Sequence, residues 1–186
     1  MKVAEFQEKL EIFPVIPAVR GEELLSALHS EAEVIFLLDA DVMTVGEKIA
    51  LAHENEKSIF IHVDLMNGIG KDRQGIRYLA ELGADGIIST RAPLIKCAKE
   101  IGLVAIQRYF AVDSHGLESI REMIASAKPD FVEIMPGIIE KVICRFADEK
   151  TPVIASGLLE TKGEVTAALA NGALAVSTGK AALWSI

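Results

Sequence analysis

The sequence alternates, eight times over, between a short run of β-branched and other apolar residues and a longer amphipathic stretch. Short apolar runs are typical of buried strands, and apolar residues at three- and four-residue spacing are typical of helices that pack one face. Strict alternation of the two makes the strands parallel, with right-handed crossovers between them. The eight runs are 15–18, 34–38, 59–63, 86–89, 104–107, 131–134, 153–155 and 173–176.

Helix patterns fill the segments between these runs, and several end at a glycine. Asp72 is expected to cap the helix that follows it. After the eighth run only residues 180–186 remain, which predicts a short final helix, whereas residues 3–10 predict a leading helix that covers the barrel floor. The remaining helices are expected at 22–28, 45–54, 73–82, 93–101, 117–127, 138–146 and 164–170.

Eight units of nearly equal length favour closure into one barrel, whereas an open doubly wound sheet usually has fewer strands. No linker or low-complexity segment divides the 186 residues. Apolar residues make up 51% of the chain and aromatic residues only 5%, so the core is expected to consist of Ile, Val, Leu and Ala rather than rings. We therefore predict an α/β fold in which residues 1–186 form a single compact, parallel (β/α)8 barrel of the TIM type.

Charge and hydropathy limit the partners of such a chain. The net charge of −8 repels a polyanion on average, so nucleic-acid binding would need a local basic patch. No apolar run approaches the roughly 18–20 residues that a membrane span requires, so we expect no membrane partner and a cytoplasmic location. Cys97 and Cys144 lack CxxC spacing and lie in apolar helical segments, so both are expected to be buried thiols without a metal or redox cofactor.

Polar residues gather after the expected strands, where the loops of a parallel barrel form one continuous rim. They follow every run from the second to the eighth, which predicts a ligand site at this rim. Arg91 and Arg108, each just past a strand end, are better anion-binding candidates than the helix-borne Lys96 and Lys99. The rim residues include Asp39, Asp41, His62, Asp64, Asn67, Thr90, Arg91, Arg108, Glu133, Ser156, Ser177 and Thr178.

The loops after strands seven and eight carry the sharpest signal, because barrels commonly bind a substrate phosphate there. Glycine lets backbone N–H groups approach an anion, a helix N-terminus adds partial positive charge, and Lys180 offers a point charge. The alternative is that both loops are tight turns capped by a hydroxyl group. Since two such turns fall on the expected pair of loops, we predict a phosphate site formed by Ser156, Gly157, Ser177, Thr178 and Gly179.

His62 and Asp64 stand two residues apart, so on a strand their side chains share a face that points into the barrel mouth. Gln107 and Glu133 are expected to face the same lumen. Such a set can form an acid/base pair, bind the hydroxyl groups of a polyol or ligate a metal ion, although no third ligand has a spacing that singles out a metal site. The alternative for His62 is a core imidazole bonded to Asp64.

Two kinds of barrel chemistry are absent. No expected strand contains lysine, which barrel aldolases need for a Schiff base. The D-x-K-x-x-D array of orotidine-type decarboxylases is missing too, since Met66 stands where its lysine belongs. We therefore assign no catalytic residue and no cofactor.

Several stretches, in the order found here, resemble the glycerol uptake operon antiterminator family. The resemblance runs from about Phe13 to the end of the chain. The family usually shows A-G-G-L after the seventh strand, where this chain has Ala155-Ser156-Gly157-Leu158. The matching stretches are HVDLMNGIGKD (62–72), DGIIST (85–90), GLVAIQRYFAVDS (102–114), KPDFVEIMPG (128–137) and ALAVSTG (173–179).

The resemblance implies a regulator that senses glycerol-3-phosphate and, when loaded, binds leader mRNA so that transcription passes a terminator ahead of glycerol-uptake genes. It also implies the residues that line the effector site. They are His62, Asp64, Gln107, Arg108, Glu133, Ser156, Gly157, Ser177 and Thr178.

Two other functions stay open at the level of sequence. One is a phosphosugar isomerase or lyase that uses His62, Asp64 and Glu133 for proton transfer. The other is a metabolite-binding barrel without RNA activity, since no RNA-recognition signature stands in the sequence and the RNA-binding surface is unassigned. Arg91, Lys96 and Lys99 could form a basic patch that binds RNA, and the alternative is that they are the charged residues of an ordinary solvent-exposed helix face. A homo-oligomer also stays open.

Overall fold

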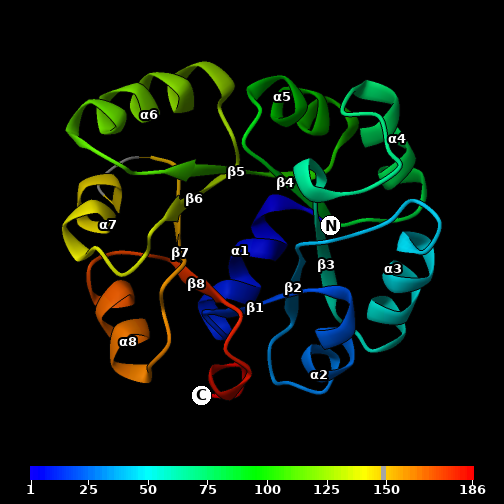
Figure 1. The fold of residues 1–186 in the computed structure, drawn as a ribbon, viewed down its shortest axis with the longest axis horizontal. Helices are drawn as coiled ribbons and strands as arrows, with labels where there is room; N and C mark the ends of the chain where they lie inside the picture. Colours follow the sequence, from blue (N-terminus) through cyan, green and yellow to red (C-terminus); the bar gives the residue numbers. More distant parts are fainter. Residues whose placement is uncertain (148–149) are drawn as a thin grey trace.

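The computed structural model describes residues 1–147 and 150–186, and its eight strands form the closed parallel barrel that the alternation predicts (Figure 1). Each strand pairs in parallel with its neighbour in sequence, and β8 pairs with β1 to close the ring. The strands are β1 (Val15–Val19), β2 (Val34–Leu37), β3 (Ser58–His62), β4 (Gly86–Ser89), β5 (Val104–Phe110), β6 (Phe131–Met135), β7 (Val153–Ser156) and β8 (Ala175–Thr178).

A helix follows each of the first seven strands, and one 3-10 turn follows the eighth, which confirms the short final helix. Figure 1 shows these helices as an outer ring around the strands. The helices are α1 (Val3–Ile12), α2 (Leu24–Leu28), α3 (Val45–Glu54), α4 (Arg73–Glu81), α5 (Ala92–Ile101), α6 (Ser114–Ala127), α7 (Glu140–Ala147) and α8 (Lys162–Ala170), and the 3-10 turns are η1 (Gly21–Glu23), η2 (Val63–Leu65) and η3 (Ala181–Leu183).

Several element boundaries differ from the expected ones, and β5 runs on to Phe110, so Arg108 lies on the strand and not just past its end. Three of the other differences have local reasons. α6 begins three residues early because the Asp113 carboxylate accepts the N–H of Gly116 and caps the helix there. α7 begins at Glu140 because the N–H of Gly137 bonds to carbonyl groups of the loop after β7, which holds the chain away from helical geometry. β8 begins at Ala175 because the N–H of Ala173 still bonds to the end of α8.

The barrel lumen combines aliphatic side chains with a cluster of phenylalanine rings, so the expectation of an aliphatic core holds for most of the core but missed these rings. Phe6 of α1 enters the ring of strands, and its ring centroid lies 4.5 Å from that of Phe60 and 4.7 Å from that of Phe131. Lys9 of the same helix bonds to Ser58 at the start of β3, so α1 covers the amino ends of the strands as predicted (Figure 1). At Gly86 a side chain would meet the Phe60 ring at 2.3 Å, so this glycine makes room for the ring.

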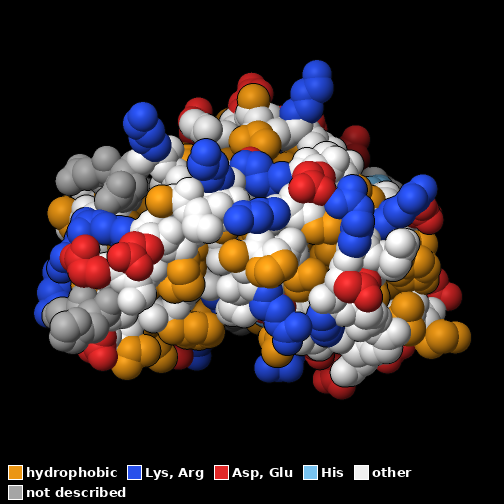
Figure 2. Space-filling view, turned by 90° about the horizontal axis from the view of Figure 1, so that it is seen from above, with side chains coloured by type: hydrophobic (Ala, Val, Ile, Leu, Met, Phe, Trp, Pro, Cys, Tyr) orange, Lys and Arg blue, Asp and Glu red, His pale blue; other side chains and the backbone are white. Residues whose placement is uncertain are grey.

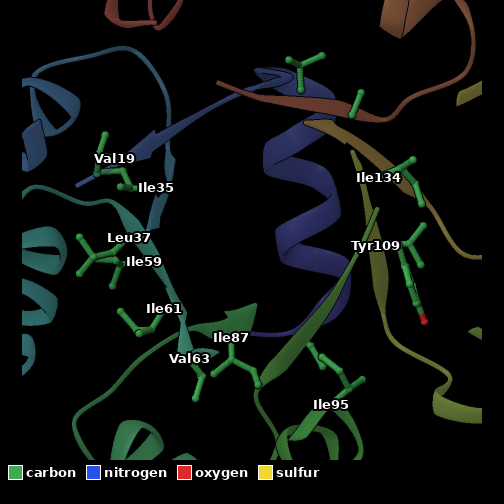
Figure 3. Close-up of a cluster of buried hydrophobic side chains, with 14 of the residues drawn as sticks. Val19, Ile35, Leu37, Ile59, Ile61, Val63, Ile87, Ile95, Tyr109 and Ile134 are labelled. Carbon is green, nitrogen blue, oxygen red and sulfur yellow. The ribbon is translucent and has the colours of Figure 1, made fainter. Parts of the chain in front are cut away.

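The layer between strands and helices is aliphatic, as expected. Figure 3 shows Val19, Ile35, Ile59 and Ile87 pointing from the strands toward the helices, away from α1. Cys97 of α5 is buried in this layer, as predicted.

The prediction for Cys144 was wrong, because this thiol is exposed. α7 turns Val142, Ile143 and Phe146 toward the barrel, so the intervening position faces solvent. Asp72 caps α4 as predicted, since its carboxylate accepts the N–H groups of Gln74 and Gly75. Over the described residues, no helix has both the length and the apolar character needed to cross a membrane.

The floor helix supplies a test of this packing. Phe6→Ala should lower the free energy of unfolding by about 3–5 kcal/mol, because it leaves a cavity between Phe60 and Phe131 that the barrel cannot close. Urea unfolding followed by circular dichroism measures this change. Val3→Ala, on the exposed side of the same helix, should cost less than about 0.5 kcal/mol. Equal losses in the two variants would show that α1 is not part of the core.

Candidate functional site

A pocket of about 450 Å³, here called the mouth pocket, opens at the carboxyl ends of β1 and β5–β8. All five residues predicted to bind phosphate line it, which confirms that the polar turns after β7 and β8 share one mouth. Arg108 also lines it. The lining consists of Ala18, Arg20, Glu23, Leu38, Arg108, Met135, Ser156, Gly157, Leu158, Leu159, Glu160, Ser177, Thr178, Gly179 and Lys180, so it holds two carboxylates besides its cations.

A chain of buried polar groups forms the floor of the mouth pocket. The guanidinium Nε of Arg108 donates to Glu133 Oε2 at 2.6 Å, and the Ser177 hydroxyl donates to Glu133 Oε1 at 2.8 Å. The hydroxyl oxygens of Ser177 and Ser156 lie 2.8 Å apart and share a further hydrogen bond. Both carboxylate oxygens of Glu133, which is fully buried, are therefore satisfied.

Strand register brings these four residues together. Arg108 lies directly beside Glu133 across the β5–β6 pair, and Ser156 lies beside Ser177 across the β7–β8 pair. Each stands two residues beyond a lumen residue of its own strand, so alternation turns all four inward. Burial raises the pKa of Glu133, but the charge and hydrogen bond of Arg108 and the two serine hydroxyls outweigh it and hold the pKa below its ordinary value. Glu133 is thus a carboxylate, and its ion pair with Arg108 holds the positively charged guanidinium in place at the pocket floor.

The loop after β7 lines the pocket and includes backbone N–H groups without a protein acceptor. Gly157 and Leu158 both have positive φ, 81° and 61°. This conformation is unfavourable for leucine, and burial does not compensate for it because the Leu158 side chain is 66% exposed. Among the described residues, the N–H groups of Gly157, Leu158 and Gly179 have no protein acceptor. Successive N–H groups in such a turn form a concave anion-binding surface.

The helix N-terminus contributes less than the sequence suggested. Thr161 caps α8, and the carboxylate of Glu164 accepts the N–H groups of Glu160 and Thr161, so these donors are already used. Loop amides and side chains, and not a helix end, are the donors that face the pocket. The Thr178 hydroxyl donates to the Leu159 carbonyl at 2.8 Å and so ties the two loops together.

Two further cations stand over the mouth pocket. Lys180 forms an exposed ion pair with Glu160 at 3.1 Å, and Arg20 lies 3.9 Å from Asp39. Sequence reasoning missed Arg20, although it directly follows β1 and so obeys the same strand-end rule that identified the other rim residues. Together with Arg108, these groups give the pocket three cations from three different strand ends.

His62 is buried at the end of β3 and points into the lumen, two residues beyond Phe60. Burial, with the charge of Arg108, lowers the pKa of His62 to about 4, so the ring is neutral near pH 7. Its Nδ1 atom has no hydrogen-bond partner among the described residues, which departs from the alternative of an imidazole bonded to Asp64. A neutral, unpartnered imidazole in a polar lumen is suited to a ligand hydroxyl group.

Asp64 does not lie on a strand, because β3 ends at His62 and the chain turns into η2. Its carboxylate accepts bonds from the Ser89 hydroxyl and from the N–H and hydroxyl of Thr90, at 2.7–2.8 Å. Arg91 approaches the same carboxylate at 3.8 Å. Asp64 therefore pins the loop after β4 to the loop after β3, and neither it nor His62 is among the residues that line the mouth pocket.

Gln107 does not face the lumen, which corrects the expectation. It alternates with Arg108 and shares the outward side of β5 with Ala105 and Tyr109, and Figure 3 shows Tyr109 on that side. Its amide donates to the Thr90 carbonyl at 3.3 Å and so supports the loop that Asp64 holds. No group of three or more His, Cys, Asp or Glu residues suited to a metal ion is found among the side chains that the structure describes.

The buried imidazole predicts a pH dependence. Between pH 6.5 and about pH 4 the unfolded chain protonates this histidine and the folded chain does not, so stability falls as the pH falls through this window. The free energy of unfolding of the wild type should therefore drop by roughly 2–3 kcal/mol more than that of His62→Asn between these pH values. Urea titrations at each pH measure it, and His29→Asn, at an exposed histidine, should behave as the wild type. Parallel curves for wild type and His62→Asn would contradict a neutral buried ring.

Comparison with known proteins identifies the family of this chain. The family model "Glycerol-3-phosphate responsive antiterminator" matches residues 15–184. The chain is 34% identical over 176 residues to the Escherichia coli (strain K12) protein YgcP, described as uncharacterized, covering 93% of this chain and 92% of that protein.

Two solved structures are similar in both fold and sequence. One is the glycerol uptake operon antiterminator regulatory protein of Listeria monocytogenes, with a TM-score of 0.88, 34% identity and coverage of 92% of this chain and 95% of that one. The other is a glycerol uptake operon antiterminator-related protein of Thermotoga maritima, with a TM-score of 0.83, 31% identity and coverage of 91% and 96%. The chain therefore belongs to the glycerol-3-phosphate responsive antiterminators, a family of regulators and not of enzymes.

Proposed function

We propose that the mouth pocket binds glycerol-3-phosphate and that the loaded protein, acting in the cytoplasm, binds leader mRNA of glycerol-uptake genes so that transcription passes a terminator. The observation that carries the proposal is the anion-binding character of the pocket. Arg108 gives its Nε to Glu133 and still lines the pocket, while unpaired N–H groups of Gly157, Leu158 and Gly179 stand at the edge. Charge-assisted bonds of this kind favour phosphate.

The size and depth of the pocket support a small effector. Glycerol-3-phosphate has about ten non-hydrogen atoms, and small-molecule sites start at roughly 300 Å³, so 450 Å³ suffices. We place the phosphate against the loops after β7 and β8, with Lys180 exchanging its Glu160 partner for it. The glycerol hydroxyl groups then point down to Glu133 and Ser177 and, further along the lumen, to the unpartnered nitrogen of His62. Asp64 and Gln107 serve this site by holding the neighbouring loops.

Calorimetry tests the effector half of the proposal. Glycerol-3-phosphate should bind with one site per chain, and glycerol, which lacks the phosphate, should bind at least a hundredfold more weakly. Lys180→Ala should weaken binding about tenfold, because one charge-assisted contact is lost from an exposed side chain that the fold does not need. Lys162→Ala, also exposed but on α8 outside the pocket, is the matched control. Equal affinities for glycerol and glycerol-3-phosphate would contradict the assignment of a phosphate site to this pocket.

Filter binding tests the RNA half. The leader transcript of a glycerol-uptake gene should be retained more strongly in the presence of saturating glycerol-3-phosphate than in its absence, because the effector shifts the population toward the binding-competent state. Affinity should fall steeply as salt rises, since phosphate contacts release counterions. Effector binding without retention of any leader RNA, at low salt as well as high, would instead identify a metabolite-binding barrel that lacks the RNA role.

A further inference from the structure

A second pocket, of about 670 Å³, lies on the outside of the barrel and is lined by four cationic side chains. We call it the basic pocket. Lys99 comes from α5 and Arg121 from α6, whereas Lys128 and Lys150 stand just before β6 and β7. None of the described residues that line it is acidic, although the whole chain carries a net charge of −8. Figure 2 shows the face formed by the helices at the top of Figure 1, on which Lys and Arg side chains lie among Asp and Glu side chains.

Two of these cations have no ion-pair partner in the described part of the chain. Lys99 lies 2.7 Å from Asp130, and Arg121 is held by Glu118 and by the ring of Phe146. Lys128 and Lys150 are exposed, and no described carboxylate lies within ion-pair distance of either. Four cations in one pocket, with no acidic residue in its described lining, raise the local potential, which attracts a polyanion to this face.

The backbone at Lys128 is a second, independent observation. Lys128 ends α6 in the left-handed region, with φ of 51°, where helices usually place glycine. α5 ends in the same way at Gly102, with φ of 94°. A lysine in this conformation is disfavoured, and the exposed side chain of Lys128 gains no burial in return. The turn directs the Lys128 carbonyl to the ammonium group of Lys99, which donates to it at 2.6 Å, so it holds two cations of the basic pocket side by side.

The walls of the basic pocket add apolar surface between the charges. Ile124 and Pro129 line it together with the stems of the cations. A binding face of this composition suits a phosphodiester chain, whose phosphates take the charges and whose sugars and bases contact the apolar atoms. A small anion would leave most of the 670 Å³ unfilled.

We propose that the basic pocket is the docking site of the RNA backbone. This inference rests on the RNA half of the proposed function and assigns its surface. The basic spot considered from sequence is thereby revised. Lys99 belongs to the face, whereas Arg91 approaches Asp64 at the rim and Lys96 does not line the pocket.

The basic pocket and the mouth pocket occupy opposite ends of the same two strands. Lys128 stands before β6, which carries Glu133, and Lys150 stands before β7, which ends at Ser156. The effector and the RNA therefore do not compete for one site, and both can be bound together.

A double variant tests the assignment. Lys128→Ala/Lys150→Ala should weaken binding of a fluorescein-labelled RNA stem-loop about 10- to 30-fold in low salt, measured by anisotropy. It should also make the slope of log K against log salt shallower by about 1.5, because two phosphate contacts are lost. Lys96→Ala/Lys162→Ala removes the same charge from exposed lysines elsewhere and should change affinity less than about threefold.

The strained position offers a sharper variant. Lys128→Gly should raise the melting temperature by about 1–4 °C, since glycine relieves the left-handed strain, and should still weaken RNA binding. Glu56→Gly is the matched control, because Glu56 has φ of 59° and lies outside the basic pocket. It should raise the melting temperature and leave RNA binding unchanged. If Lys128 had only a structural role, the Lys128→Gly variant would be more stable and would bind RNA as tightly as the wild type.

The outcomes separate this inference from the function on which it rests. If the double variant bound RNA with wild-type affinity and the same salt slope, the basic pocket would not be the docking site, but the proposed regulatory function would still stand. Wild-type protein that binds no RNA, with or without glycerol-3-phosphate, would overturn both. Calorimetry with glycerol-3-phosphate should give the same affinity for wild type and double variant, which shows that the mouth pocket is unaffected.

Discussion

The buried ion pair between Arg108 and Glu133 is the constraint around which the barrel mouth is organised. A carboxylate without solvent must have its oxygens satisfied, so β8 supplies Ser177, and β7 supplies Ser156 behind it. The same cation helps to keep His62 neutral across the lumen. Removal of either charge would leave its partner buried and unpaired, which typically costs 3–5 kcal/mol. The pair therefore ties three neighbouring strand interfaces to one fixed geometry.

This floor determines what the edge of the pocket can bind. Because Glu133 occupies one side of the guanidinium, an incoming anion meets the pocket from the loop side, where Gly157, Leu158 and Gly179 keep unpaired N–H groups. The left-handed turn at Gly157 and Leu158 is the local strain that this arrangement requires. In the proposed function, this buried floor and the loop above it together hold the phosphate of the effector.

Sequence reasoning succeeded where one periodicity dominates. Eight units of nearly equal length predicted the closed barrel, and the glycines after β7 and β8 predicted that the two loops line one pocket. It failed where a single residue of register matters. Gln107 was assigned to the lumen, although it alternates with Arg108, and Asp64 was placed on a strand that ends two residues earlier. Arg20, although Gly21 follows it, was overlooked because the polar residues considered began after the second strand, and the left-handed Lys128 has no signature in sequence at all.

The central claim is that the phosphate of glycerol-3-phosphate lies between the loops after β7 and β8, above Arg108. A crystal structure of the protein grown with glycerol-3-phosphate measures this directly. We expect phosphate oxygens within about 3 Å of the N–H groups of Gly157 and Gly179, with the glycerol carbons directed toward Glu133. Phosphate bound instead beside Asp64 and Thr90, or at a helix end outside the barrel mouth, would contradict it.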